Sequence, residues 1–92
     1  MKVVSGKWTL LILRDLLTGT KRFGELRRSL AGVSPRTLTQ RLKELEEAGI
    51  LKRTIYAEIP PRVEYALTDR GRSLGPILDQ MRAWGAEHES PP

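Results

Sequence analysis

The stretch SPRTLTQRLKELEEAGI, residues 34–50, decides the fold of this 92-residue chain. Leu38, Leu42 and Leu45 recur at helical spacing and predict the buried face of one helix. The opposite face is polar and largely cationic, and it carries Arg36, Thr39, Gln40 and Lys43. A helix that packs through one face and presents such side chains on the other suits the major groove of DNA.

The ends of this helix are also marked in the sequence. Ser34 can accept a hydrogen bond from the free N–H groups of the first turn, as an N-cap residue does. Pro35 suits the first helical position, where its missing N–H does no harm. Gly49 predicts the C-terminal end.

The positive charge of the chain is concentrated around this helix. Residues 21–53 contain nine Lys or Arg and four Asp or Glu, a net of +5, which equals the net charge of the whole chain. Charge confined to one segment favours a polyanionic partner, most commonly nucleic acid. Basic patches also serve acidic membranes, other proteins and solubility, so charge alone leaves these alternatives open.

The remaining patterns predict the order of elements. Residues 7–17 and 23–30 form two helices before the central one, residues 51–59 and 62–67 form a hairpin, and Thr68 caps a final helix. Pro76 kinks that final helix or begins a second piece of it. We expect a mostly α fold with a small β-hairpin (α+β), a winged helix-turn-helix in which the hairpin is the wing. One domain covers residues 1–92, with the helix-turn-helix at about 22–49, the wing at about 51–67 and the C-terminal helix at about 68–88.

Apolar spacing also predicts the core. Trp8, Leu11, Ile12 and Leu16 form the buried stripe of the first helix. The core is completed by Leu26, Leu38, Leu42 and Val63.

Several functions are not supported by the sequence. The chain has no cysteine and a single histidine, His88, and it contains neither an HExxH motif nor a glycine-rich phosphate loop. We therefore expect no enzyme activity, metal site or cofactor. No apolar run is long enough to span a bilayer, and the N-terminus lacks the apolar core of a signal peptide, so the expected location is the cytoplasm.

Four strings, in order, resemble the HxlR-type transcriptional regulators of bacteria: GKWTLLILRDLLTG, RFGELRRSL, SPRTLTQRLKELEEAGIL and PPRVEYALTDRGRSL. The likeness covers residues 6–84. It implies a dimeric DNA-binding regulator, here expected to be a repressor. By the resemblance, residues 34–43 match the recognition helix, Pro61 and Arg62 match the wing tip, and residues 74–84 match the dimerisation helix.

One feature departs from the family pattern. Many members carry a cysteine shortly before the GKW motif and use it to sense oxidants, quinones or aldehydes, whereas this chain has none. The chain then responds to another signal, such as a small-molecule effector, or acts constitutively, or has a trimmed N-terminus.

The winged architecture predicts the DNA contacts. Residues at the N-terminal part of the recognition helix reach base edges, where Arg36 can bind guanine and Gln40 adenine. Arg62, Arg53, Lys21 and Arg22 suit phosphates, whereas Glu44, Glu46 and Glu47 point away from the groove. The full expected DNA-binding set is Lys21, Arg22, Ser34, Pro35, Arg36, Thr37, Thr39, Gln40, Lys43, Arg53 and Arg62.

The final helix carries an apolar stripe of Leu74, Ile77, Leu78, Met81 and Trp84. The stripe is either core or a dimer face, and we expect a shared role with Met81 and Trp84 toward the partner. A homodimer would place two recognition helices about 34 Å apart on a palindromic duplex. Two alternatives remain at this point: a MarR-like or PadR-like regulator, and a winged-helix module for protein–protein contact.

Overall fold

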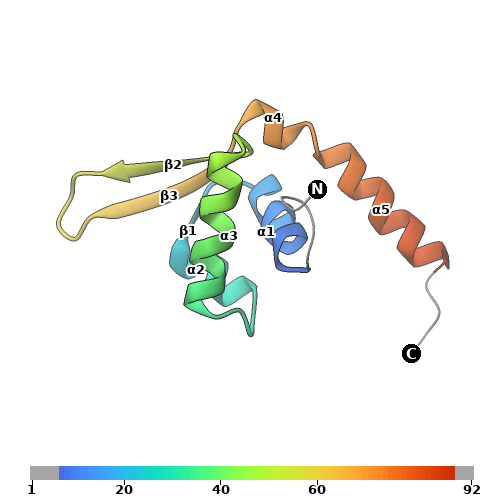
Figure 1. The fold of residues 1–92 in the computed structure, drawn as a ribbon, viewed down its shortest axis with the longest axis horizontal. Coiled ribbons are helices and arrows are strands. Elements are labelled where there is room, and N and C mark those ends of the chain that lie inside the picture. Colours follow the sequence, from blue (N-terminus) through green and yellow to red (C-terminus); the bar gives the residue numbers. More distant parts are fainter. Residues whose placement is uncertain (1–6, 89–92) are drawn as a thin grey trace.

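A computed structural model describes residues 7–88, without the side chains of residues 82 and 85–88. Its helices and strands form a helical body with a wing that extends from it (Figure 1). In chain order they are α1 (Lys7–Leu17), β1 (Lys21–Arg22), α2 (Phe23–Ser29), α3 (Pro35–Glu47), β2 (Leu51–Tyr56), β3 (Arg62–Leu67), α4 (Asp69–Arg72) and α5 (Gly75–His88). This is the expected mostly α winged helix-turn-helix with a small β component. None of the helices in the described part is long and apolar enough to cross a membrane.

The core lies where α1, α2 and α3 meet the base of the wing. Its buried side chains are Ile12, Leu13, Leu16, Leu26, Leu30, Val33, Leu38, Leu42, Leu45, Ile50, Leu51 and Leu67. The prediction of which α1 residues are buried was partly wrong, because the buried residues of α1 are Thr9, Ile12, Leu13 and Leu16. Trp8, Leu11 and Val63 are only half-buried.

The sheet has one strand more than the expected hairpin. The short strand β1 pairs antiparallel with β3, which places Lys21 opposite Tyr65 and Arg22 opposite Glu64. A strand of two residues has no periodicity by which the sequence could reveal it. The strand order is β1-β3-β2, so β3 is the central strand.

The first wing strand is shorter than expected. It ends at Tyr56 rather than Ile59, because residues 57–61 form the turn of the hairpin. Paired residues run from Leu51 opposite Leu67 to Tyr56 opposite Arg62. Proline cannot donate to a ladder, so the prolines at positions 60 and 61 belong in this turn.

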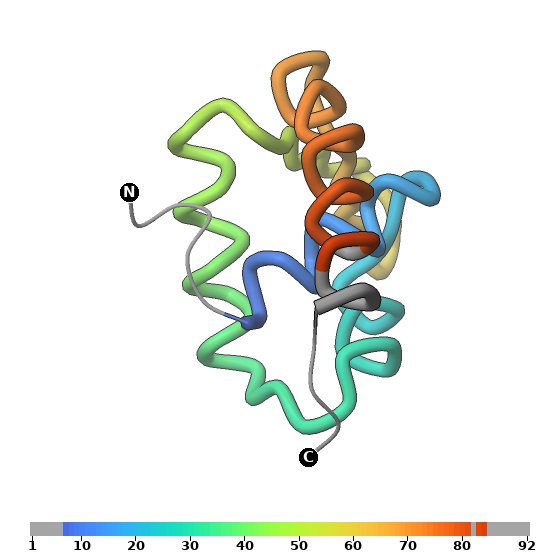
Figure 2. The backbone as a smooth tube through the Cα atoms, turned by 90° about the vertical axis from the view of Figure 1, so that its right-hand side faces the viewer, coloured from blue at the N-terminus to red at the C-terminus, as the bar shows by residue number. Residues whose placement is uncertain are grey.

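The C-terminal segment is two helices. Thr68 caps α4, and a new helix, α5, begins at Gly75 with Pro76 in its first turn, one of the two outcomes expected for that proline. The change of direction takes α5 away from the sheet (Figures 1 and 2). Its first turns, with Ile77 and Met81, line a hollow against α1. The wing and α5 therefore lie at opposite ends of the molecule.

Candidate nucleic-acid interface

The first turn of α3 is fixed by its N-cap. The Ser34 hydroxyl accepts a hydrogen bond from the Thr37 N–H at 3.0 Å and donates one to Thr37 Oγ1, also at 3.0 Å. Ser34 and Thr37 are thus bound to each other, and Thr37 is half-buried. Their role in the structure is to position the start of α3.

The exposed face of α3 is open and cationic. Pro35, Arg36, Thr39, Gln40 and Lys43 line one shallow surface along the first half of the helix. Neither Arg36 nor Lys43 forms an ion pair with any side chain that the structure describes. These two cations are available to a ligand, and Thr39 and Gln40 between them offer hydrogen-bonding groups.

The second half of α3 carries carboxylates that are mostly paired within the fold. Glu44 binds Arg41 at 3.1 Å, and Glu46 lies 3.6 Å from Arg53 on β2. Glu47 is exposed. The face of α3 is therefore divided along its length, cationic at its N-terminal half and anionic or neutral at its C-terminal half.

A hollow of about 290 Å³ separates α3 from the wing. It lies between Thr39, Lys43 and Glu46 on the helix and Arg53 and Tyr65 on the strands. Burial raises the pKa of the Tyr65 hydroxyl above its ordinary value of 10.0, with Arg53 opposing the shift and Glu46 adding to it. Tyr65 is therefore a neutral hydrogen-bonding group here at neutral pH.

Arg62 is held inside the wing rather than presented at its tip. Its guanidinium lies 3.1 Å from Glu58 and 3.6 Å from Glu64, and it stacks over the Tyr56 ring at 4.1 Å. The side chain is only 29% exposed. A phosphate would have to displace two carboxylates to reach it, which weighs against the predicted phosphate contact.

Further cations lie on β1, on α2 and at the base of the wing. Arg22 and Lys52 are exposed, and Lys21 is half-buried. Arg27 and Arg28 on α2 are exposed too, and they were missed by the sequence reasoning. The Arg28 guanidinium reaches back toward the first turn of α2, where Gly24 leaves room for it. An adjacent arginine pair on the polar face of α2 was the signal that could have revealed them.

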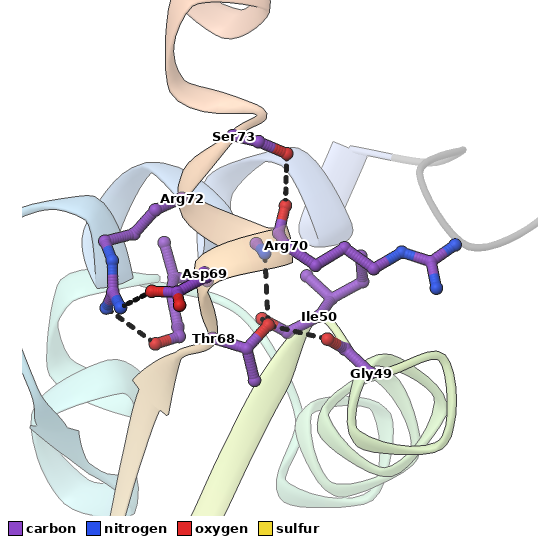
Figure 3. Close-up of polar contacts among 9 residues, drawn as sticks. Gly49, Ile50, Thr68, Asp69, Arg70, Arg72 and Ser73 are labelled. Atoms are coloured by element: carbon purple, nitrogen blue, oxygen red, sulfur yellow. Dashed lines mark hydrogen bonds and ion pairs between the residues drawn. The ribbon is translucent and has the colours of Figure 1, made fainter.

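Thr68 ties the wing to the helices around it (Figure 3). Its hydroxyl approaches the carbonyl oxygens of Gly49 and Ile50 at 2.6 and 3.1 Å, and it accepts a hydrogen bond from the Gly71 N–H at 3.1 Å. Arg72 donates to the Leu67 carbonyl at 2.9 Å. This junction joins the end of α3, the start of β2, the end of β3 and α4.

The apolar stripe of the final helical segment divides into two parts. Leu74 and Leu78 are half-buried and pack against the core. Ile77, Met81 and Trp84 are 52%, 51% and 64% exposed. Between α5 and α1 lies an apolar hollow of about 100 Å³ lined by Leu10, Leu13, Leu74, Ile77, Leu78 and Met81.

The acidic side chains in the described part of the chain do not gather into a group that could hold a metal ion. The side chain of His88 lies outside the described residues.

Known proteins share this architecture. The HTH-type transcriptional regulator YtcD of Bacillus subtilis is 47% identical over 88 residues, which are 96% of this chain and 70% of the relative. A regulator of Synechocystis, sll1512, is 48% identical over 85 residues, 92% of this chain and 63% of its own length. The redox regulator HypR in its reduced form superposes with a TM-score of 0.90 at 43% identity, over 96% of this chain and 87% of that structure.

A match over almost the whole chain identifies the family to which this protein belongs. The sequence model described as HxlR-like helix-turn-helix matches residues 3–91. The assignment favours the HxlR type over the MarR-like and PadR-like alternatives. With this match, the relatives and the observed winged helix, the chain belongs to the HxlR-like helix-turn-helix family of DNA-binding transcriptional regulators.

Proposed function

We propose that this protein binds a palindromic operator as a homodimer and represses transcription there, with α3 in the major groove of each half-site. It acts by binding rather than by catalysis, and it works in the cytoplasm, where chromosomal DNA is found. The observation that carries the proposal is the exposed N-terminal half of α3, where Arg36 and Lys43 have no described ion-pair partner.

The docking follows from the division of α3. In helix-turn-helix proteins the N-terminal residues of the recognition helix contact base edges, while the preceding helix crosses the phosphate backbone. Arg36 and Gln40 therefore face bases, with Thr39 and Lys43 beside them. Lys21, Arg22, Arg27 and Arg28 lie on the preceding segment and suit phosphates. Arg53 and Arg62 reach phosphate only by exchanging their carboxylate partners. We therefore expect them to contribute less to phosphate binding than the cations of the preceding segment.

The dimer is proposed from the exposed part of the α5 stripe. Ile77, Met81 and Trp84 lie at the opposite end of the molecule from the wing. Two copies that join through this end leave both α3 faces open to DNA. Isologous contact of this kind produces the two-fold symmetry that a palindrome matches.

The apolar hollow between α1 and α5 is the proposed place for an effector. A small apolar molecule that enters it would push α5 away from α1 and change the dimer geometry. Such a ligand would supply the signal that this chain, without a cysteine, cannot receive through a thiol.

Selection of bound sequences from a random duplex pool tests the proposal. A palindromic consensus with half-sites about one helical turn apart is the expected result. Repression is tested by placing that consensus over a reporter promoter. A chain that enriches no sequence over bulk DNA would instead fit a winged-helix module for protein–protein contact.

A further inference from the structure

The hollow between α3 and the wing brings opposite charges together at the edge of the exposed α3 face. Thr39 and Lys43 line both that face and the hollow, so the two surfaces are continuous. Beyond Lys43, the residues of α3 that line the hollow are Glu46 and Glu47. The phosphates of a duplex seated on the exposed face of α3 would therefore pass close to two carboxylates.

The side chains that line this hollow carry no net charge. The positive charges of Lys43 and Arg53 are matched by the negative charges of Glu46 and Glu47. Arg53 comes from β2, and its guanidinium lies 3.6 Å from the Glu46 carboxylate. Phosphate binding depends on cations that release counterions, so Arg53 cannot contribute fully to it while this ion pair stays closed.

The ion pair between Arg53 and Glu46 is weak enough to open. The two side chains are 43% and 39% exposed, and a pair at such a surface adds little to stability because water screens both charges. A phosphate within reach of Arg53 offers a charged acceptor in place of the carboxylate. Tyr65 lines the same hollow, and its hydroxyl can donate to that phosphate as well. Arg53 can thus exchange one anion for another.

An operator and other DNA would use this ion pair differently. On an operator, base contacts by the first half of α3 hold the helix in the major groove and bring the neighbouring phosphates to the hollow. On other DNA these base contacts are missing, and binding relies on phosphates alone. The closed pair then keeps one cation out of the complex, which weakens binding to the wrong duplex.

We propose that Glu46 is a specificity-determining residue, which keeps Arg53 occupied on arbitrary DNA and releases it to a phosphate only when α3 is seated in the operator. This proposal rests on the proposed function, in which the first half of α3 reads bases. The role of Glu46 differs from that of Arg36, because Glu46 selects against the wrong duplex and makes no contact with the right one.

The experiment compares binding to an operator selected by the wild-type chain with binding to a duplex of the same length and composition in scrambled order. Glu46→Gln keeps the size of the side chain and removes its charge. It should strengthen binding to the scrambled duplex about fivefold and to the operator less than about twofold, so the specificity ratio falls. The slope of log K against log salt on the scrambled duplex should steepen by about one unit, because Arg53 then meets phosphate there.

Glu44→Gln is the matched control. Glu44 lies in the same half of α3 and is 42% exposed, but its partner at 3.1 Å is Arg41, and neither residue lines the hollow. This variant removes the same charge and measures the gain in affinity that comes from net charge alone. That gain should be equal on the two duplexes and leave the specificity ratio unchanged.

Arg53→Gln separates the release of a cation from the loss of a repulsive carboxylate. If the gain of Glu46→Gln comes from Arg53, the double variant should exceed Arg53→Gln on the scrambled duplex by no more than Glu44→Gln exceeds wild type. Arg53→Gln alone should weaken operator binding and leave binding to the scrambled duplex nearly unchanged, because only the operator complex uses Arg53.

Three results would each overturn this role of Glu46. They are a Glu46→Gln gain no larger than that of Glu44→Gln, an equal gain on both duplexes, and a full gain that persists without Arg53. Each of them leaves the proposed function intact, provided that the wild-type chain still selects a palindromic sequence. Failure of the wild-type chain to enrich any sequence would remove the proposed function itself.

Discussion

At the scale of single residues, two glycines differ in the space that they leave for a larger side chain. A Cβ on Gly71 would lie 2.1 Å from the Ile50 carbonyl oxygen, which is backbone and cannot move aside cheaply. A Cβ on Gly24 would meet nothing closer than the Arg28 guanidinium at 3.6 Å, an ordinary contact. Both glycines are helical, so helix propensity favours alanine at both positions.

Gly71→Ala should therefore destabilise the protein by at least about 2–3 kcal/mol, because the overlap outweighs the gain in propensity. Gly24→Ala serves as the matched control and should be neutral or stabilising by up to about 1 kcal/mol. Urea unfolding of the two variants measures both free energies. Equal stabilities would mean that α4 packs less closely on Ile50 than the structure indicates.

Arg36 is the residue at which base reading is most directly tested. It is exposed at the start of α3 and lacks a described ion-pair partner. Arg36→Ala should relax the preference at one base position by about 1–3 kcal/mol, which binding to operators altered one pair at a time will measure. Uniform weakening on every operator would assign Arg36 to a phosphate instead.

At the scale of elements, the arginines on α2 and those on the wing differ in their partners. Arg28 on α2 is exposed and has no described ion pair, whereas Arg53 and Arg62 are each paired to carboxylates. Only an unpaired cation releases a counterion in full when it meets phosphate. The salt dependence of binding should thus come mainly from α2 and the start of α3.

Arg28→Gln should weaken binding to all duplexes alike and make the slope of log K against log salt shallower by about one unit. Arg70→Gln, an exposed arginine on α4, is the control and should leave the slope unchanged. Titrations at several salt concentrations give both slopes. An unchanged slope for Arg28→Gln would place α2 away from the backbone.

The elements also show what the sequence could predict. Local signals predicted the ends of α3 well, because Ser34, Pro35 and Gly49 lie at or next to those ends. Gly49 has a φ of +75°, as expected for a glycine that ends a helix. Contacts across the chain were less predictable. The strand β1 exists only because β3 lies beside it, and the pairing of Arg62 depends on how the hairpin turn places Glu58. A charged residue at a wing tip looks free in sequence, and only the turn shows that it is occupied.

At the scale of the whole molecule, α5 keeps a large apolar surface outside the core. Leu74 and Leu78 pack inward, whereas Ile77, Met81 and Trp84 remain about half exposed or more. A small domain with a modest core gains stability when such a face is covered. Assembly of two chains through α5 would cover it.

Met81→Glu should shift the protein from dimer to monomer and weaken operator binding at least tenfold, because a carboxylate would be buried at the interface. Ala83→Glu adds the same charge at an exposed position on another side of α5 and should leave the dimer intact. Sedimentation velocity distinguishes the two species. A Met81→Glu protein that remains dimeric would require a different interface.

The junction at Thr68 has a consequence for the DNA itself. One hydroxyl joins the end of α3 to the wing and to α4, so the elements that we propose to contact a half-site are tied to one another. The start of α5 lies outside these elements. An effector that binds at α5 would leave the preferred base sequence of each half-site unchanged. It would change the number of base pairs that best separates the two half-sites, so induction of the proposed regulator would alter its preferred spacer length.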